Sequence, residues 1–212
     1  MLNLFQTDFA AALIILAVLV VSFTLHELAH ATVAVWEGDN TPELEGRLTL
    51  NPLRHIDPMG FILIIVAGFG WARPVNTRPD RYRHGRWGEV AVSLAGIAAN
   101  LLVAAACLGA VALLNANRTA LGGALEVTLL RAAIVSVQLN LLLAVFNALP
   151  IPPLDGSHVV GALLGGEAQV AWNRLAANAG IMLILVLVLV GPLIARVTGG
   201  WTNALLNAVM TR

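Results

Sequence analysis

Charge is scarce in this chain, and lysine is absent from it. Only 11% of the 212 residues are charged, against about 25% in an average soluble domain, and all twelve cations are arginine. The formal net charge is zero, which excludes the basic face that nucleic-acid phosphates require, so we expect no nucleic-acid partner. The hydrophobic share of 58% instead predicts an integral membrane protein.

Cysteine is nearly absent as well. Cys107 is the single cysteine, so an intramolecular disulfide is excluded. Its neighbours are alanine and leucine, and we expect it to be a small buried side chain without redox chemistry.

Long apolar runs, by contrast, are abundant. A hydrocarbon core of about 30 Å takes about 20 helical residues to cross, and four runs reach or approach that length: Phe9–Trp36, Val90–Leu114, Leu129–Leu149 and 179–197. The first run lacks a basic leader and is too long for a cleavable signal, so we expect it to be a span. A shorter run, Ile56–Ala72, is broken by proline and glycine, which predicts a re-entrant or interfacial segment, with an extra span as the alternative. The whole chain, 1–212, is therefore predicted to be one all-α polytopic membrane domain.

Arginine distribution predicts the topology. Five of the twelve arginines lie between residues 72 and 89, and the positive-inside rule makes that loop cytoplasmic, where it would also contact anionic lipid. The spans Phe9–Trp36 and Leu129–Leu149 then both run toward the cytoplasm. Between the first span and the arginine-rich loop, the alternating residues Arg47–Leu50 predict a small cytoplasmic-side β-strand or hairpin.

Three ionisable residues interrupt the first apolar run, in the stretch FTLHELAHATVAVW at residues 23–36. Such groups are costly inside a bilayer and indicate a function. His26 and His30 are four residues apart on a helix, so both imidazoles can bind one ion. Glu27 lies beside the first histidine, where it can act as a base on water. The spacing predicts a catalytic zinc ion, with purely structural contacts between helices as the alternative.

Asp155, in the stretch NALPIPPLDGSH, is the candidate third ligand. It follows a span that runs inward and is then broken by three prolines. His26 lies about 15 Å from the end of its own helix at about 1.5 Å per residue, so both groups are expected in the same leaflet. Because aspartate also favours helix N-termini, a capping role for Asp155 is the alternative.

The stretches HELAH, NPLRHIDPMG, ARPV and FNALPIPPLDG together resemble the site-2 protease family of intramembrane zinc metalloproteases, in a compact form without a PDZ domain. The resemblance implies that one zinc ion is held by His26, His30 and Asp155. It also implies that Glu27 is the general base and that Asn147 contacts the substrate or stabilises the oxyanion. The chain departs from the family in AGIAAN, residues 95–100, where members often have Ala-Gly-Pro before the asparagine. This departure bears on the helix shape near Asn100 and not on the zinc site.

Other polar residues have two interpretations each. Asn147 is equally compatible with a hydrogen bond between helices. Asn140 is interpreted as a packing residue, with support of the metal ligands as the alternative. His55 is interpreted as an interfacial histidine near a turn, and His158 as a helix-surface residue; a role beside the metal or the substrate is the alternative for each.

The predicted function is hydrolysis of peptide bonds in or near transmembrane segments of membrane proteins. An unwound substrate would add as a strand to Leu48, Thr49 and Leu50. Substrate selection would depend on the membrane region or on separate regulatory or adaptor proteins. The composition suggests a prokaryotic cytoplasmic membrane, with the active site toward the cytoplasm. A catalytically silent helix-binding protein and a metal transporter are the alternatives. The intact Glu27 disfavours the first, and ligands confined to one side disfavour the second.

Overall fold

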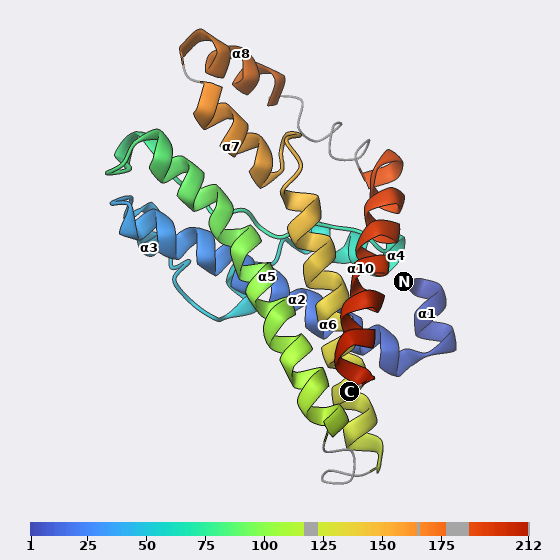
Figure 1. The fold of residues 1–212 in the computed structure, drawn as a ribbon. Helices are drawn as coiled ribbons and strands as arrows, with labels where there is room; N and C mark the ends of the chain where they lie inside the picture. The colour runs from blue at the N-terminus through green and yellow to red at the C-terminus, as the bar shows by residue number, and fades with distance from the viewer. Residues whose placement is uncertain (117–122, 165, 177–186, 212) are drawn as a thin grey trace.

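The computed structural model describes residues 1–116, 123–164, 166–176 and 187–211. This part of the chain is predominantly helical (Figure 1), and its β-structure is limited to an isolated antiparallel bridge between Ile56 and Ala72. Three of its helices are long and apolar enough to cross a membrane: α2 (Phe9–Trp36), α5 (Arg86–Ala116) and α6 (Gly123–Asn147). These helices confirm the prediction of an all-α membrane protein. Residues 179–186 of the predicted span 179–197 lie outside the described residues, and α10 (Gly191–Met210) begins within the rest of it.

Helix α5 is the centre of the arrangement. It packs against α2 on one side and α6 on another, and α10 covers both α6 and α5 (Figure 1). The buried residues at these contacts are mostly small, such as Ala34 on α2, Ala104 on α5 and Ala144 on α6. Small side chains let membrane helices approach closely, which compensates for the weak hydrophobic drive between helices in lipid. Helix α5 is continuous past Asn100, so the departure from the family pattern at residues 95–100 does not interrupt it.

The N-terminal and re-entrant segments lie beside α2. Helix α1 (Leu2–Thr7) precedes Asp8, whose side chain accepts a hydrogen bond from the Ala11 amide and caps α2. Helix α4 (Pro58–Ala67) is capped by Asp57 and stops at Gly68, which has a left-handed φ of 84°. Ten helical residues cover about 15 Å, half of a hydrocarbon core, so α4 by itself does not span. Its length favours the re-entrant or interfacial interpretation.

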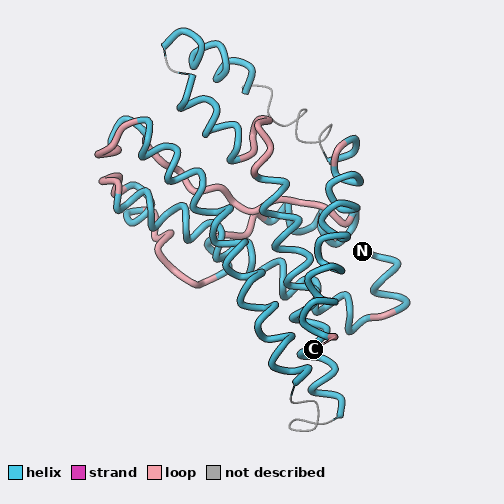
Figure 2. The backbone as a smooth tube through the Cα atoms, viewed as in Figure 1, coloured by secondary structure: helices cyan, strands magenta, loops and turns pink. Residues whose placement is uncertain are grey.

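The connection from α2 to α5 runs mostly without regular structure (Figure 2), apart from α3 (Thr41–Leu44), α4 and two short 3-10 turns, η1 (Pro52–Arg54) and η2 (Pro79–Arg81). The predicted strand or hairpin at Arg47–Leu50 is not formed. Instead, the Thr49 amide donates to the Arg47 carbonyl, and the Thr49 carbonyl accepts from the His55 ring. These local and side-chain bonds occupy the groups that strand pairing would need.

Helices α7 (Asp155–Leu164) and α8 (Gly166–Ala176) follow α6 and lie together at its end (Figure 1). A Cβ atom at Gly156 would collide with the carbonyl oxygens of Ala148 and Leu149, so glycine is needed for α7 to start against the end of α6. The Trp172 indole donates to the Ser157 carbonyl at 2.9 Å and joins α8 to α7. This packing fixes the first residue of α7, Asp155, beside α2.

Candidate metal centre

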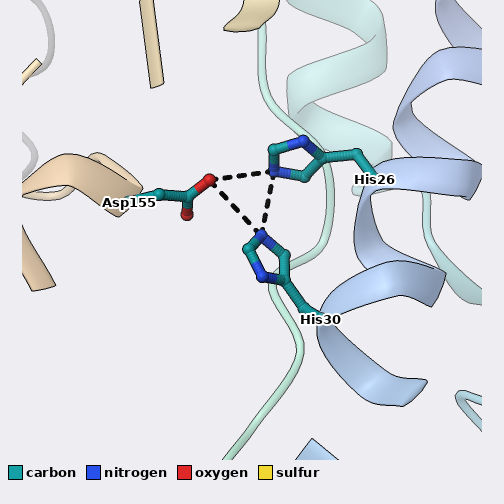
Figure 3. Close-up of side chains that lie close together, drawn as sticks. All are labelled: His26, His30 and Asp155. Atoms are coloured by element: carbon teal, nitrogen blue, oxygen red, sulfur yellow. Dashed lines mark hydrogen bonds and ion pairs between the residues drawn. The ribbon is translucent and has the colours of Figure 1, made fainter. Parts of the chain in front are cut away.

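Three predicted ligands meet at one point of the structure (Figure 3). His26 and His30 come from the same face of α2, and their Nε2 atoms are 3.0 Å apart. The Asp155 Oδ2 atom, from the start of α7, lies 3.3 Å from the first Nε2 and 3.4 Å from the second. Within the described residues these three form the one cluster with ligand atoms close enough to hold a metal ion.

The protonation of His30 follows from its backbone partner. Its Nδ1 lies 2.7 Å from the Val92 carbonyl oxygen on α5. A carbonyl only accepts, so Nδ1 carries the proton, and a neutral imidazole then has a lone pair on Nε2. The lone pair of His30 therefore points toward His26 and Asp155.

The protonation of His26 follows from a chain of hydrogen bonds that ends at another backbone carbonyl. The Asn140 amide nitrogen donates to the Ser136 carbonyl, so the Asn140 Oδ1 accepts from the Asn100 amide nitrogen at 2.8 Å. The Asn100 Oδ1 then accepts from His26 Nδ1 at 2.6 Å. Each amide can face only one way in this chain, and His26 also carries its lone pair on Nε2.

This arrangement fits a cation. Two lone pairs 3.0 Å apart repel each other, and the buried Asp155 Oδ2 accepts no hydrogen bond within the described residues. Zinc ligands at about 2.0–2.1 Å in tetrahedral geometry lie about 3.3–3.4 Å apart, close to the observed separations. Two imidazoles and one carboxylate are also a ligand set of catalytic zinc sites, which keep the fourth position open.

Gly96 of α5 makes room for the two imidazole rings. A Cβ atom at this position would lie 2.5 Å from His26 Cε1 and 2.6 Å from His26 Nε2, and it would also collide with His30 Nε2. Since any other side chain adds at least that atom, glycine allows α5 to pack this close to the Nε2 atoms of both histidines.

Glu27 faces a different set of partners from the histidines beside it. Its Oε2 accepts a hydrogen bond of 3.0 Å from the Val75 amide and lies 3.8 Å from the Arg47 Nη2. Burial lowers the pKa of Arg47 and the charge of Glu27 opposes that shift; a guanidinium remains cationic in either case. The base candidate is thus held by the connection between α2 and α5.

A cavity of about 560 Å³ opens onto the three candidate metal ligands. His26, Glu27 and Asp155 contribute to its wall, together with Asn147 at the end of α6 and apolar side chains of α2, α6 and the segment 70–74. The volume is in the range of small-ligand sites, and the wall is mostly apolar. The cavity therefore gives access to both the ligand cluster and Glu27.

The remaining predicted residues lie at different distances from this cluster. Asn147 lines the cavity, although its amide nitrogen donates to the Leu143 carbonyl of its own helix. Asn140 supports His26 through Asn100, as its alternative interpretation proposed. His55 is fully buried and bonded to the Thr49 carbonyl, and His158 is exposed on α7. Leu48, Thr49 and Leu50 are not among the cavity-lining residues, and their substrate role stays a prediction.

No role was predicted for Asn100, Val92 or Gly96. Asn100 is a buried amide in an apolar span, and the cost of such a group in lipid is the signal by which the sequence could have identified it. Val92 acts through its carbonyl and carries no sequence signal.

Asp39, just after the end of α2, binds the arginine-rich loop through a hydrogen bond. This fully buried carboxylate accepts hydrogen bonds from the Thr41 amide and hydroxyl and from the Arg78 amide at 2.6 Å. Burial by itself raises the pKa of Asp39, but these bonds and the nearby Arg81 outweigh that effect and lower it below its ordinary value. The ionised carboxylate therefore stabilises the loop.

The chain is similar to a known family and to several curated proteins. Residues 14–191 match peptidase family M50. The chain is 42% identical to the protein named "Putative zinc metalloprotease YwhC" of Bacillus subtilis over 186 residues, which cover 88% of this chain and 84% of that protein. It is 34% identical to "Putative zinc metalloprotease Rip2" of Mycolicibacterium smegmatis, over 87% of this chain and 69% of that protein.

A third similar protein is the Rip2 protein of Mycobacterium tuberculosis H37Rv, 32% identical over 85% of this chain and 66% of that protein. No solved structure matches the chain. The resemblance seen in the motifs is confirmed, and the chain belongs to peptidase family M50, the zinc metalloproteases of the site-2 type, as an integral membrane member.

Proposed function

We propose that this protein is an intramembrane endopeptidase that hydrolyses peptide bonds in or near the transmembrane segments of other membrane proteins. The proposal rests on the cavity of about 560 Å³. Two candidate metal ligands, His26 and Asp155, and the candidate base Glu27 line the same wall as apolar side chains of the candidate spanning helices. A site of this kind is suited to a hydrophobic peptide that enters from the bilayer. Membrane protein substrates and the lipid around them are thus the proposed partners.

One zinc ion per chain would be held by His26, His30 and Asp155. Zinc bound there would lower the pKa of a coordinated water to about 7 and polarise the scissile carbonyl. Glu27 Oε1 would accept the water proton and return it to the leaving amide nitrogen, the usual work of a general base and acid. The hydrogen bonds that the two Nδ1–H groups donate to the Val92 carbonyl and the Asn100 Oδ1 keep both histidines in the tautomer that this arrangement needs.

Asn147 would donate its amide N–H to the carbonyl oxygen of the substrate. One hydrogen of that amide nitrogen bonds to the Leu143 carbonyl at 3.1 Å, and the second would serve the substrate. Removal of such a donor typically costs about 10² to 10³ in rate. The arginine-rich loop supports a cytoplasmic orientation of the site in a prokaryotic cytoplasmic membrane.

The test compares wild type with Glu27→Gln, with Glu43→Gln as an exposed carboxylate control on α3. Each protein is purified in detergent, its zinc content is measured, and a panel of single-span proteins is incubated with it. We expect about one zinc per chain in all three and cleavage lost only in Glu27→Gln. Absence of zinc from the wild type, or equal cleavage by Glu27→Gln, would refute the mechanism. Zinc binding without cleavage of any member of a broad panel would favour a helix-binding protein.

A further inference from the structure

Arg47 is a buried cation that the mechanism above does not use. It is 3% exposed and lies in the connection between α3 and η1. Its Nη2 lies 3.8 Å from Glu27 Oε2 and donates to the Arg73 carbonyl at 2.5 Å. Its Nε is also buried, with no hydrogen-bond partner within the described ranges. Because burial of a charge is costly even when it is paired, the position of Arg47 beside Glu27 indicates a role.

A ring of hydrogen bonds fixes the guanidinium in place. The Arg73 amide donates to the His55 carbonyl at 2.8 Å, and the fully buried His55 ring donates to the Thr49 carbonyl at 2.8 Å. The Arg47 amide donates to the Pro42 carbonyl at 2.8 Å, which anchors the same segment to α3. The Arg47 side chain closes this ring through the Arg73 carbonyl. The position of the guanidinium is therefore set by its bond to the Arg73 carbonyl as well as by its own flexible side chain.

Arg47 and Val75 act on the same oxygen of Glu27. The Val75 amide donates to Oε2 at 3.0 Å, and the Arg47 guanidinium approaches Oε2 from its own segment. A glutamate side chain has three rotatable bonds, and two contacts on one oxygen restrict its rotation. Because Glu27 also lines the cavity, Oε1 is the oxygen left for the reacting water.

We propose that Arg47 is a positioning residue for Glu27, which orients the carboxylate and holds the segment 71–76 against it. This inference rests on the proposed role of Glu27 as the base. Without the guanidinium, the Arg73 carbonyl loses its donor and the Glu27 carboxylate loses its counter-charge. The carboxylate is then free to rotate, and a misplacement of about 1 Å costs about 10²-fold in rate.

The defect should fall on the chemical step and not on substrate binding. Arg47 is not among the cavity-lining residues, and the wall that would contact a substrate is mostly apolar. It also contacts none of the three zinc ligands in the interactions that the structure records. Loss of Arg47 is thus expected to lower kcat while KM and zinc content stay near the wild-type values.

The test uses Arg47→Gln and Arg47→Lys, with Arg81→Gln as the matched control. Arg81 pairs with Asp39 at 3.9 Å, nearly the same separation, in the same connection between α2 and α5 but away from Glu27. The assay measures kcat and KM on the single-span protein of the panel that the wild type cleaves fastest. Zinc content and hydrogen exchange of the segment 71–76 are measured on the same samples.

We expect Arg47→Gln to lower kcat about 10- to 100-fold, with KM within about 2-fold of wild type, full zinc content and faster exchange at Val75. Arg47→Lys should lose about 3- to 10-fold, because a lysine keeps the charge but lacks the rigid, planar guanidinium whose Nη2 contacts both the Arg73 carbonyl and Glu27 Oε2. Arg81→Gln should match the wild type. Glu27→Gln, assayed in parallel, tests the proposed function itself.

An inactive Glu27→Gln together with a fully active Arg47→Gln would overturn the inference and leave the protease proposal standing. Equal loss in Arg47→Gln and Arg81→Gln would also overturn it, because the effect would then belong to the loop as a whole. If Arg47→Gln fails to fold or to hold zinc, Arg47→Lys decides instead: kcat equal to wild type would contradict the need for the guanidinium. An active Glu27→Gln would refute the proposed function.

Discussion

Gly96→Ala should destroy the zinc site with a single added methyl group. The new Cβ would lie 2.5 Å from His26 Cε1 and 2.6 Å from its Nε2, whereas ordinary contacts start at 3.4 Å. The shortfall is about 0.8–0.9 Å by subtraction of these distances. Metal–ligand distances tolerate shifts of only about 0.2 Å. Rotation of the imidazoles away from the methyl group therefore moves them off the metal position.

A retreat of α5 does not rescue the site. It would lengthen the bond from His26 to Asn100, now 2.6 Å, and the bond from His30 to Val92, now 2.7 Å, by about the same amount. Both bonds would then approach the limit near 3.5 Å beyond which a hydrogen bond is lost. Loss of such supporting bonds typically costs 10- to 100-fold in metal affinity. Since the ligands themselves are also displaced, we expect a loss of at least about 100-fold, or about 2.7 kcal/mol.

Competition against a zinc chelator of known affinity measures this loss in purified protein. Gly109→Ala is the matched control, because Gly109 also lies on α5 and a Cβ there meets no atom within 4 Å. Circular dichroism should show the same helix content for both variants. Zinc affinity of Gly96→Ala within about 3-fold of wild type would refute the reasoning, since it would mean that α2 and α5 do not approach as closely as described.

Three further predictions concern the supports of the site. Asn100→Ala removes the acceptor of His26 Nδ1 and should weaken zinc binding about 10- to 100-fold in the same competition assay. Gly156→Ala should displace Asp155 by pushing α7 off the end of α6, so that zinc content falls while circular dichroism is unchanged. Asp39, whose pKa is lowered in the folded protein, stabilises it above the ordinary aspartate pKa, and that contribution is lost as the pH falls through the lowered value. The midpoint of thermal unfolding in detergent should therefore fall more between pH 5 and pH 3 in wild type than in Asp39→Asn; equal slopes would contradict this assignment.

The sequence was sufficient to predict the three candidate spans α2, α5 and α6 and the clustering of His26, His30 and Asp155. Helical spacing places His26 and His30 on one face, and that relation depends only on the backbone geometry of a single helix. Arginine counts predicted that the first and third predicted spans run in the same direction, and three prolines marked the end of α6. These rules need no knowledge of how helices pack, and they were enough to bring Asp155 to the same end of the bundle as the histidines.

The features that the sequence did not predict depend on tertiary packing. The role of Val92 depends on the rotation of α5 against α2, which a carbonyl group cannot signal. At Arg47–Leu50 the alternation of side chains predicted a strand, but a buried arginine and a buried histidine determined the conformation instead. Tertiary context commonly overrides strand propensity in so short a segment.

The two halves of the site have different supports, because neighbouring residues on a helix point about 100° apart. His26 and His30 face α5, and rigid helices hold them through Val92 and Asn100. Glu27 faces the connection between α2 and α5, where Val75 and a buried guanidinium hold it. Substitutions on α5 should consequently act on zinc affinity, and substitutions in the connection should act on kcat at full zinc occupancy. A variant in the connection that lost zinc while its helices stayed intact would show that the two supports are coupled, and the separation argued from the contacts would be wrong.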